Sequence, residues 1–180
     1  MLLTYNQCME KYKTKYYLKK AVELEELFYI EKGVYSDVRY VPELQVISFK
    51  YPNAIFTMDS AFYFYDLTDV IPDKYYLVTG RGAAPIADKR VKQIFENSLS
   101  LNDGAVEMER EGTRIRIYSK ERMLVELIRN KNKLPFDYYK EIIVNYRKIL
   151  DMLDYRAIED YAYAVPKTGM IMDTIRKEVM

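Results

Sequence analysis

Residues 105 to 119 alternate between apolar and charged side chains. AVEMERE is followed by Gly112 and then by TRIRIYS, so a glycine turn separates two runs of period two. This pattern predicts an antiparallel hairpin with one buried face and one wet face. On the wet face, cross-strand pairing of opposite charges explains Glu107, Glu109, Glu111, Arg114 and Arg116.

The segment before this hairpin, from residue 38 onward, predicts a succession of short helices and strands. Pro42 suits the first turn of a helix, where its missing N–H is not needed. Asp59 and Ser60 stand near the start of another helix. The expected elements are a helix at 41–51, a strand at 54–57, a helix at 58–65, and strands at 75–79 and 91–96.

The last third of the chain is predicted to be helical. Ser119 is a cap residue, and the apolar residues after it recur at helical spacing. Pro135 opens the longest predicted helix, and two further helices follow at 155–165 and 170–180. We therefore expect a mixed α/β (α+β) domain over residues 41–180 that ends in a helical segment.

Residues 1–37 predict a separate small unit. Thr4 and Thr14 are candidate N-caps of helices at 4–12 and 15–25, which a two-residue turn joins as in a helix-turn-helix. The runs 27–30 and 34–36, with EKG between them, predict a small hairpin that serves as a wing. The core side of the second helix is expected to carry Tyr17, Leu18, Ala21, Val22 and Leu24.

The chain contains no histidine and no tryptophan, and Cys8 is its single cysteine. The missing histidine excludes Ser-His-Asp and Cys-His catalysis, and it excludes zinc sites that need imidazole. The acids show no convergent pattern with a lysine, so neither a metal site nor an enzyme is expected, and no cofactor is required. The nineteen tyrosines are expected to fill the core and its rim, with an apolar body and a polar tip.

No apolar run approaches the ~20 residues that span a bilayer. The first residues lack the pattern of a secretory signal, and a lone cysteine suits a reducing compartment. A cytoplasmic protein without membrane contact is therefore expected. No heptad seam is present, so a monomer is expected in solution.

The net charge is only +1, but the charges are segregated along the chain. A local basic patch matters more for nucleic-acid binding than the total charge does. The candidate DNA-binding side chains lie on or beside the second predicted helix, with one at the wing tip: Lys11, Lys13, Lys15, Tyr16, Lys19, Lys20 and Lys32. The alternative is an ordinary solvated lysine face on an amphipathic helix.

The glycine-containing loop TGRGAAPIADKR, residues 79–90, follows a predicted strand. It lacks the G-K-[S/T] of a P-loop and the third glycine of a dinucleotide fingerprint, so nucleotide binding is not expected there. Its cations Arg81, Lys89 and Arg90 form a possible second basic surface for DNA, RNA or a partner.

Arg122, Glu126 and Arg129 stand at i, i+4 and i+7 in the helix after the hairpin. Ion pairs on a helix surface explain this spacing. The alternative is a motif that fixes the C-terminal domain or faces a partner.

Three stretches, in this order, resemble the AbiEi family of antitoxins. The first is the wing EKGVYSD at residues 31–37. The second is YPNAIFTMDSAFYFYDLTDVIPDKYYLVTGRG at 51–82, and the third is IRIYSKERMLVELIRNKNKLPFDYYKEII at 115–143. The resemblance extends over roughly residues 4–165.

The resemblance implies an N-terminal winged helix-turn-helix and a C-terminal α/β antitoxin domain. It also implies a DNA-binding autorepressor of a type IV toxin–antitoxin, or abortive infection, system. Such antitoxins bind repeats in their own promoter and counter a nucleotidyltransferase-type toxin without forming a stable complex with it.

This chain departs from the family because only MLL precedes Thr4, so the winged helix is expected to be one helix shorter than usual. The alternative function is therefore a protein- or RNA-binding interaction module whose degenerate winged helix no longer binds DNA.

Overall fold

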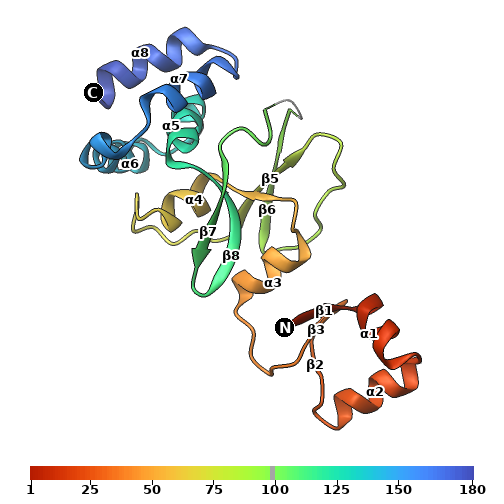
Figure 1. The fold of residues 1–180 in the computed structure, drawn as a ribbon. Coiled ribbons are helices and arrows are strands. Elements are labelled where there is room, and N and C mark those ends of the chain that lie inside the picture. Colours follow the sequence, from red (N-terminus) through yellow and green to blue (C-terminus); the bar gives the residue numbers. More distant parts are fainter. Residues whose placement is uncertain (98–99) are drawn as a thin grey trace. The chain divides into compact units, whose positions relative to one another are not determined.

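The computed structural model describes residues 1–97 and 100–180, which form helices and two β-sheets (Figure 1). By contacts, the chain divides into two compact units. The first unit comprises Met1–Pro52 and Glu111–Arg114, and the second comprises Asn53–Arg110 and Ile115–Met180. The division lies later than residues 37 to 41 because helix α3 (Glu43–Lys50) is grouped with the first unit.

The first unit has the element order β1-α1-α2-β2-β3-α3. Its strands form a three-stranded antiparallel sheet in the order β1-β3-β2. The bounds are β1 Leu2–Thr4, α1 Tyr5–Tyr12, α2 Lys15–Glu23, β2 Phe28–Glu31 and β3 Val34–Ser36. The two predicted helices and the hairpin are confirmed. Strand β1 was not predicted, because three residues are too few to show a period.

Two threonines start the two short helices as predicted. The Thr4 hydroxyl accepts a hydrogen bond from the Gln7 N–H at 3.2 Å, and the Gln7 side chain accepts one from the Thr4 N–H. The Thr14 hydroxyl accepts one from the Tyr17 N–H at 3.3 Å. Each cap satisfies a donor that the helix itself leaves unpaired.

The core of the first unit is small. Cys8, Leu18, Ala21 and Leu27 form its buried cluster. Helices of this length are marginal alone and depend on such packing. Cys8 serves here as a small apolar residue, and burial raises the pKa of its thiol although Lys11 opposes the shift.

The second unit contains the longer sheet and most of the helices. Its strands are β4 Ile55–Phe56, β5 Tyr75–Gly80, β6 Val91–Glu96, β7 Ala105–Arg110 and β8 Thr113–Tyr118. Its helices are α4 Met58–Phe64, α5 Lys120–Arg129, α6 Phe136–Lys148, α7 Tyr155–Tyr163 and α8 Thr168–Glu178. Each of these elements was predicted within a few residues.

The sheet of the second unit has the order β6-β5-β4-β8-β7 and mixes parallel and antiparallel pairs. The two-residue strand β4 lies at its centre, where Phe56 pairs with Leu77 of antiparallel β5 and with Ile117 of parallel β8. Strands β5 and β6 are parallel. Because parallel neighbours need a crossover connection, strands far apart in the chain meet here.

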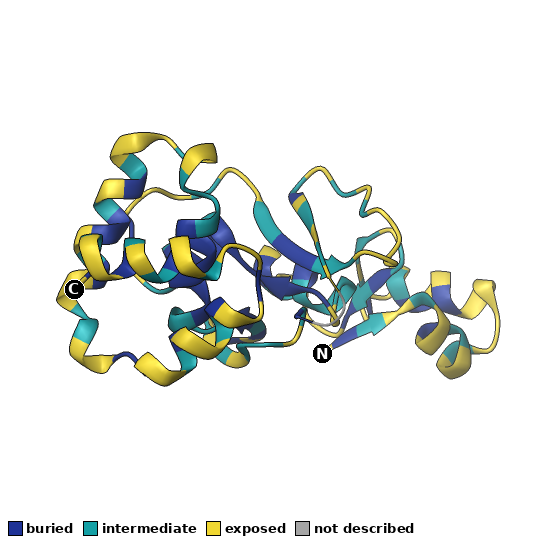
Figure 2. Cartoon of the chain, turned by 90° about the horizontal axis from the view of Figure 1, so that it is seen from above, coloured by how far each residue is buried: buried dark blue, intermediate teal, exposed yellow. Residues whose placement is uncertain are grey.

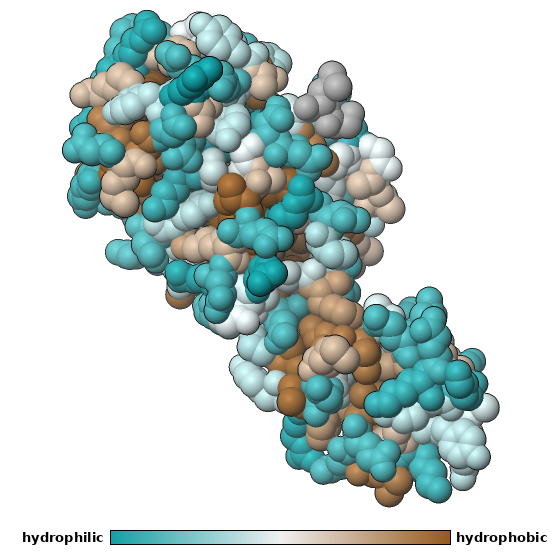
Figure 3. Space-filling view, in the orientation of Figure 1, coloured by the Kyte–Doolittle hydropathy of each residue, from teal (hydrophilic) through white to brown (hydrophobic). Residues whose placement is uncertain are grey.

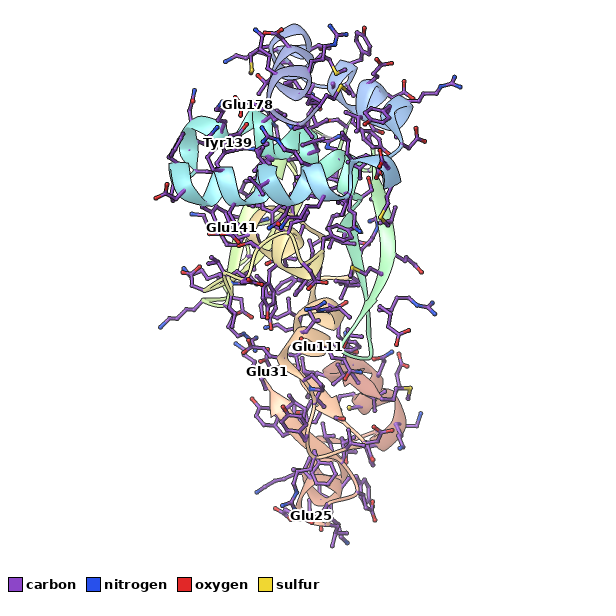
Figure 4. All side chains as sticks on the ribbon, turned by 90° about the vertical axis from the view of Figure 1, so that its left-hand side faces the viewer. Glu25, Glu31, Glu111, Tyr139, Glu141 and Glu178 are labelled. Atoms are coloured by element: carbon purple, nitrogen blue, oxygen red, sulfur yellow. The ribbon has the colours of Figure 1, made fainter. Side chains whose placement is uncertain are left out.

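Helices α5 to α8 gather at one end of this sheet (Figure 1). Helix α5 is the buried one among them, since residues 122–128 are all buried (Figure 2). Helix α8 is tied to α6 by the Tyr139 hydroxyl, which donates to the Glu178 carboxylate at 2.8 Å (Figure 4).

Three tyrosines of the second unit, the buried Tyr118 and Tyr146 and the half-buried Tyr65, combine an apolar body with a polar tip as expected. The hydroxyls of Tyr65, Tyr118 and Tyr146 donate to backbone carbonyls of the second unit at 2.9 Å each. Burial raises the pKa of all three phenols. Each ring thus fills core volume while its hydroxyl keeps a hydrogen-bond partner.

A fully buried arginine lies at the centre of the second unit. Arg122 has no exposed surface, and its Nε donates to Glu126 Oε1 at 3.0 Å. Its Nη1 donates to the carbonyls of Ser100 and Asp103 at 3.3 and 3.4 Å. Its Nη2 lies 2.9 Å from Glu126 Oε1, an ion-pair contact outside hydrogen-bond geometry.

Two further side chains complete this charge cluster. Arg129 Nη1 lies 2.6 Å from Glu126 Oε1 and 2.9 Å from Glu96 Oε2. Burial acts to raise the pKa of the Glu96 carboxyl, but hydrogen bonds from the Asn97 N–H and from Arg129 outweigh burial, so the pKa is lowered. The expectation of surface ion pairs at these positions is therefore wrong, because Arg122 and Glu126 are buried. The alternative, a motif that fixes the C-terminal domain, agrees with the structure.

Gly104 allows Arg122 to occupy this position. Its backbone has φ +79°, and a Cβ placed on it would lie 2.6 Å from Arg122 Cβ. A distance below 3.0 Å between such atoms is not tolerated without a backbone shift. Gly112, in the turn between β7 and β8, also has a positive φ of 71° but meets nothing within 4 Å.

We predict that Gly104→Ala destabilises the chain more than Gly112→Ala does. Both variants place a Cβ on a residue with left-handed backbone, which lowers the free energy of unfolding by about 1 kcal/mol each. Gly104→Ala adds the clash with Arg122. The expected loss is above about 2 kcal/mol for Gly104→Ala. Urea unfolding measures both, and equal losses would contradict the assigned close contact.

We also predict that Arg122→Met lowers the free energy of unfolding by roughly 3 kcal/mol, within the range for breaking a buried ion pair. The change leaves the Asp103 carbonyl without its Arg122 donor, while the Ser100 carbonyl keeps the bond from the Asp103 N–H. The control is Lys177→Met, which removes an exposed pair with Asp173 and should cost less than about 1 kcal/mol. If the two losses measured by urea unfolding are alike, the buried cluster does not stabilise this unit.

Candidate nucleic-acid interface

Helix α2 exposes one continuous polar face. Leu18 and Ala21 point into the core of the first unit, with exposed fractions of 4% and 3%. The four predicted side chains of the face are all exposed: Lys15, Tyr16, Lys19 and Lys20. Hydrophilic residues predominate over α1 and α2 on the side drawn in Figure 3.

The apolar side of α2 is narrower than predicted. Tyr17 and Leu24 were expected to face the core, but they are 56% and 59% exposed. Leu24 is the C-cap of the helix, so the turn beyond it no longer follows helical spacing. Tyr17 stacks edge-to-face on Tyr16 at 5.4 Å between ring centroids. The surface of α2 is therefore more aromatic than the sequence indicated.

Two of the lysines border a groove that other elements complete. Lys15 and Lys19 line a hollow of about 460 Å³ together with Leu18 and Val22 of α2. The other wall carries three tyrosines, one each from α1, β2 and β3: Tyr5, Tyr29 and Tyr35. Tyr29 is 55% exposed and lies edge-to-face with Tyr35 at 5.6 Å. Sequence reasoning did not select these tyrosines, because they become neighbours only when the hairpin folds against the helices.

The remaining lysines of α1 and α2 meet at a second hollow. Lys11 and Lys20 line it together with Tyr12 and Tyr17. Lys11 Nζ lies 5.2 Å from the centroid of the Tyr12 ring. A smaller hollow of about 200 Å³ brings Tyr16 together with Lys19 and Lys20. The first unit thus interleaves lysines and tyrosines on its surface.

Two of the predicted side chains lie at turns. Lys13 is the C-cap of α1, with φ 65°, and it is exposed. Lys32 is exposed in the turn between β2 and β3, where Gly33 has φ +83°. A hairpin turn that carries a lysine is suited to reach a phosphate beside a helix placed in a groove of DNA.

Acidic residues limit the basic surface at the end of α2. Glu23 is exposed and lies 3.6 Å from Lys19 Nζ at i,i+4. Glu25 pairs with Arg39. Exposed pairs of this kind are weak and readily exchanged for other partners, so the Lys19 ammonium can still meet a phosphate.

The second basic surface is smaller than predicted. Arg81 and Lys89 are exposed, but Arg90 is half-buried. Arg90 donates to both carboxylate oxygens of Asp88, at 2.9 Å from Nε and 2.7 Å from Nη2. A bidentate pair neutralises the guanidinium, so Arg90 adds little positive charge to this loop.

Residues 1–97 and 100–180 contain no group of three or more Cys, Asp or Glu side chains placed to hold a metal ion. In the same residues, no helix has both the length and the apolar character needed to cross a membrane.

In comparisons with known proteins, no protein-family model and no curated protein matches this chain. The resemblance to the AbiEi family therefore rests on the three sequence stretches, and it stays a prediction.

Proposed function

We propose that the chain is a DNA-binding autorepressor and the antitoxin of a type IV-like toxin–antitoxin, or abortive infection, system. The observation that carries the proposal is the exposed face of α2, where Lys15, Tyr16, Lys19 and Lys20 lie together. The first unit would act as a small winged helix-turn-helix, with α2 in the major groove and the β2–β3 turn beside it.

The element order supports this interpretation. Two helices joined by a short turn are followed by a hairpin, and α2 is the second helix of the pair. In helix-turn-helix proteins the second helix reads the groove, while surrounding cations hold the phosphates. Here Lys11, Lys13 and Lys32 would contact phosphates, and Tyr16 would reach a base edge or sugar.

The antitoxin part of the proposal rests on the family resemblance. The second unit would counter a nucleotidyltransferase-type toxin without forming a stable complex, and the chain would carry out no catalysis itself. It would act as a cytoplasmic monomer on repeats in its own promoter. A neighbouring gene that encodes a nucleotidyltransferase-like protein would support this part.

A separate observation supports a second candidate function. The groove between α2 and the hairpin is lined by Tyr5, Tyr29 and Tyr35 as well as by lysines. A wall of tyrosines suits a protein or RNA partner, because aromatic rings bury apolar area and stack on bases. In this alternative the first unit no longer binds duplex DNA.

The test is the affinity of the full chain for duplex DNA from upstream of its own gene, measured by fluorescence anisotropy across a salt series. About four to six phosphate contacts predict a slope of roughly −4 to −5 in log K against log salt. The triple variant Lys15→Ala, Lys19→Ala, Lys20→Ala should reduce the steepness by roughly 3 and remove sequence selectivity.

The matched control is Lys74→Ala, Lys148→Ala, Lys177→Ala, which removes the same charge from exposed positions of the second unit. It should bind the duplex as the unmodified chain does. Binding that the α2 variant retains, or no selective binding at all, would overturn the repressor proposal. Selective binding of single-stranded RNA instead would favour the second candidate.

A further inference from the structure

The second unit contains a cavity of about 570 Å³ between its sheet and the end of α5. Its apolar lining includes Met58 at the start of α4, Val78 of β5 and Ile94 of β6, with Leu134 and Pro135 after α5. Volume and lining fall in the range typical of small-molecule sites, which are mostly apolar with a few placed polar groups.

The charges around this cavity favour an anion. Lys92 and Lys133 both line it and both are exposed. Among the described residues, the Lys133 ammonium donates to Asn130 Oδ1 alone, at 3.3 Å. Within residues 1–97 and 100–180 the Lys92 ammonium makes no ion pair and no side-chain hydrogen bond, so both ammonium groups can take a new partner.

The acids that share the cavity do not cancel these lysines. Glu96 and Glu126 line it, but Arg129 lies 2.9 and 2.6 Å from their carboxylates, and Arg122 also contacts Glu126. These four charges balance one another. Asp59, the third acid of the lining, offsets one of the two lysines, so the lining keeps one positive charge in excess. Lysine ammonium groups suit a phosphate.

A polar group at the start of α4 can recognise a second part of the ligand. Asp59 lines the cavity, and its carboxylate accepts hydrogen bonds from Tyr138, at 3.3 Å, and from Tyr76 of β5. Burial raises the pKa of Asp59, and burial beside this carboxyl raises the pKa of Tyr76 to about 12. The carboxylate keeps lone pairs that can accept from the N–H groups on the edge of a nucleobase.

We propose that this cavity binds a nucleoside 5′-monophosphate, with Lys92 and Lys133 on the phosphate and Asp59 with Tyr76 on the edge of the base. The flat faces of a base match the apolar walls of Met58, Val78 and Ile94, since every base has an apolar face and a polar edge. The site lies wholly within the second unit and shares no residue with the proposed DNA surface on α2.

The test uses the full chain in isothermal titration calorimetry. The probes are AMP, GMP, CMP and UMP, the corresponding nucleosides, and inorganic phosphate. At least one monophosphate should bind about tenfold more tightly than either its nucleoside or phosphate alone, because it joins two contacts in one ligand. The double variant Lys92→Ala, Lys133→Ala should weaken that monophosphate about tenfold and leave nucleoside binding unchanged.

Two controls separate this result from charge and folding effects. Lys74→Ala, Lys148→Ala removes two exposed lysines outside the cavity and should bind every probe as the unmodified chain does. Asp59→Asn should change the preferred base while keeping the preference for monophosphate over nucleoside. The proposal is overturned if none of the four monophosphates binds, or if the Lys92, Lys133 variant binds them unchanged. Because DNA affinity is measured separately, failure here leaves the repressor proposal untouched.

Discussion

The packing of several elements in the second unit depends on the fully buried guanidinium of Arg122. Removing such a charge from water costs several kcal/mol unless counter-charges and hydrogen bonds surround it. Arg122 meets this requirement with the Glu126 carboxylate and with two carbonyls from the loop before β7. It also lies 4.9 Å from the centroid of the Tyr118 ring, which adds a cation–π contact.

These contacts position more than one element at once. They join α5 to the loop at residues 100–104, and Arg129 extends the connection to Glu96 at the end of β6. Gly104 must remain without a side chain for the arginine to fit. The lining of the cavity follows from this cluster, since Glu96 and Glu126 form part of its wall while their charges are already neutralised.

The first unit combines a small core with a polar surface on its two helices. Its buried cluster is small, and its two helices rely on threonine caps and on packing against the hairpin. The lysines of α1 and α2 and the tyrosines of α2 are exposed. The side chains that gather at the hollows come from both helices and both hairpin strands. A short stretch of chain thus carries several lysines and tyrosines on its surface.

The local elements could be predicted from sequence because their signals are local. Caps at Thr4, Thr14 and Ser119, prolines at helix starts, and Gly112 in a turn act on neighbouring residues only. The sheet order could not be predicted, since β4 meets β5 and β8 through contacts that leave no periodic trace. The burial of Arg122 was also hidden, because its i,i+4 spacing to Glu126 is the same for a surface pair and a core pair.

In the candidate site, too, contacts between distant parts of the chain could not be predicted from sequence. Lysines were identified by local charge segregation, whereas Tyr29 and Tyr35 join them only through the fold. Arg90 was predicted to be available, but Asp88, two residues earlier, neutralises it.

The most direct test of the DNA-binding account is to map amide chemical shifts of the isotope-labelled chain as duplex DNA from upstream of its gene is added. The account predicts shifts concentrated at residues 11–20 and at Lys32 and Gly33, growing in proportion to bound duplex. Shifts confined to residues 53–180, or no shifts at saturating duplex, would contradict the assignment of α2 and the hairpin as the surface that reads DNA.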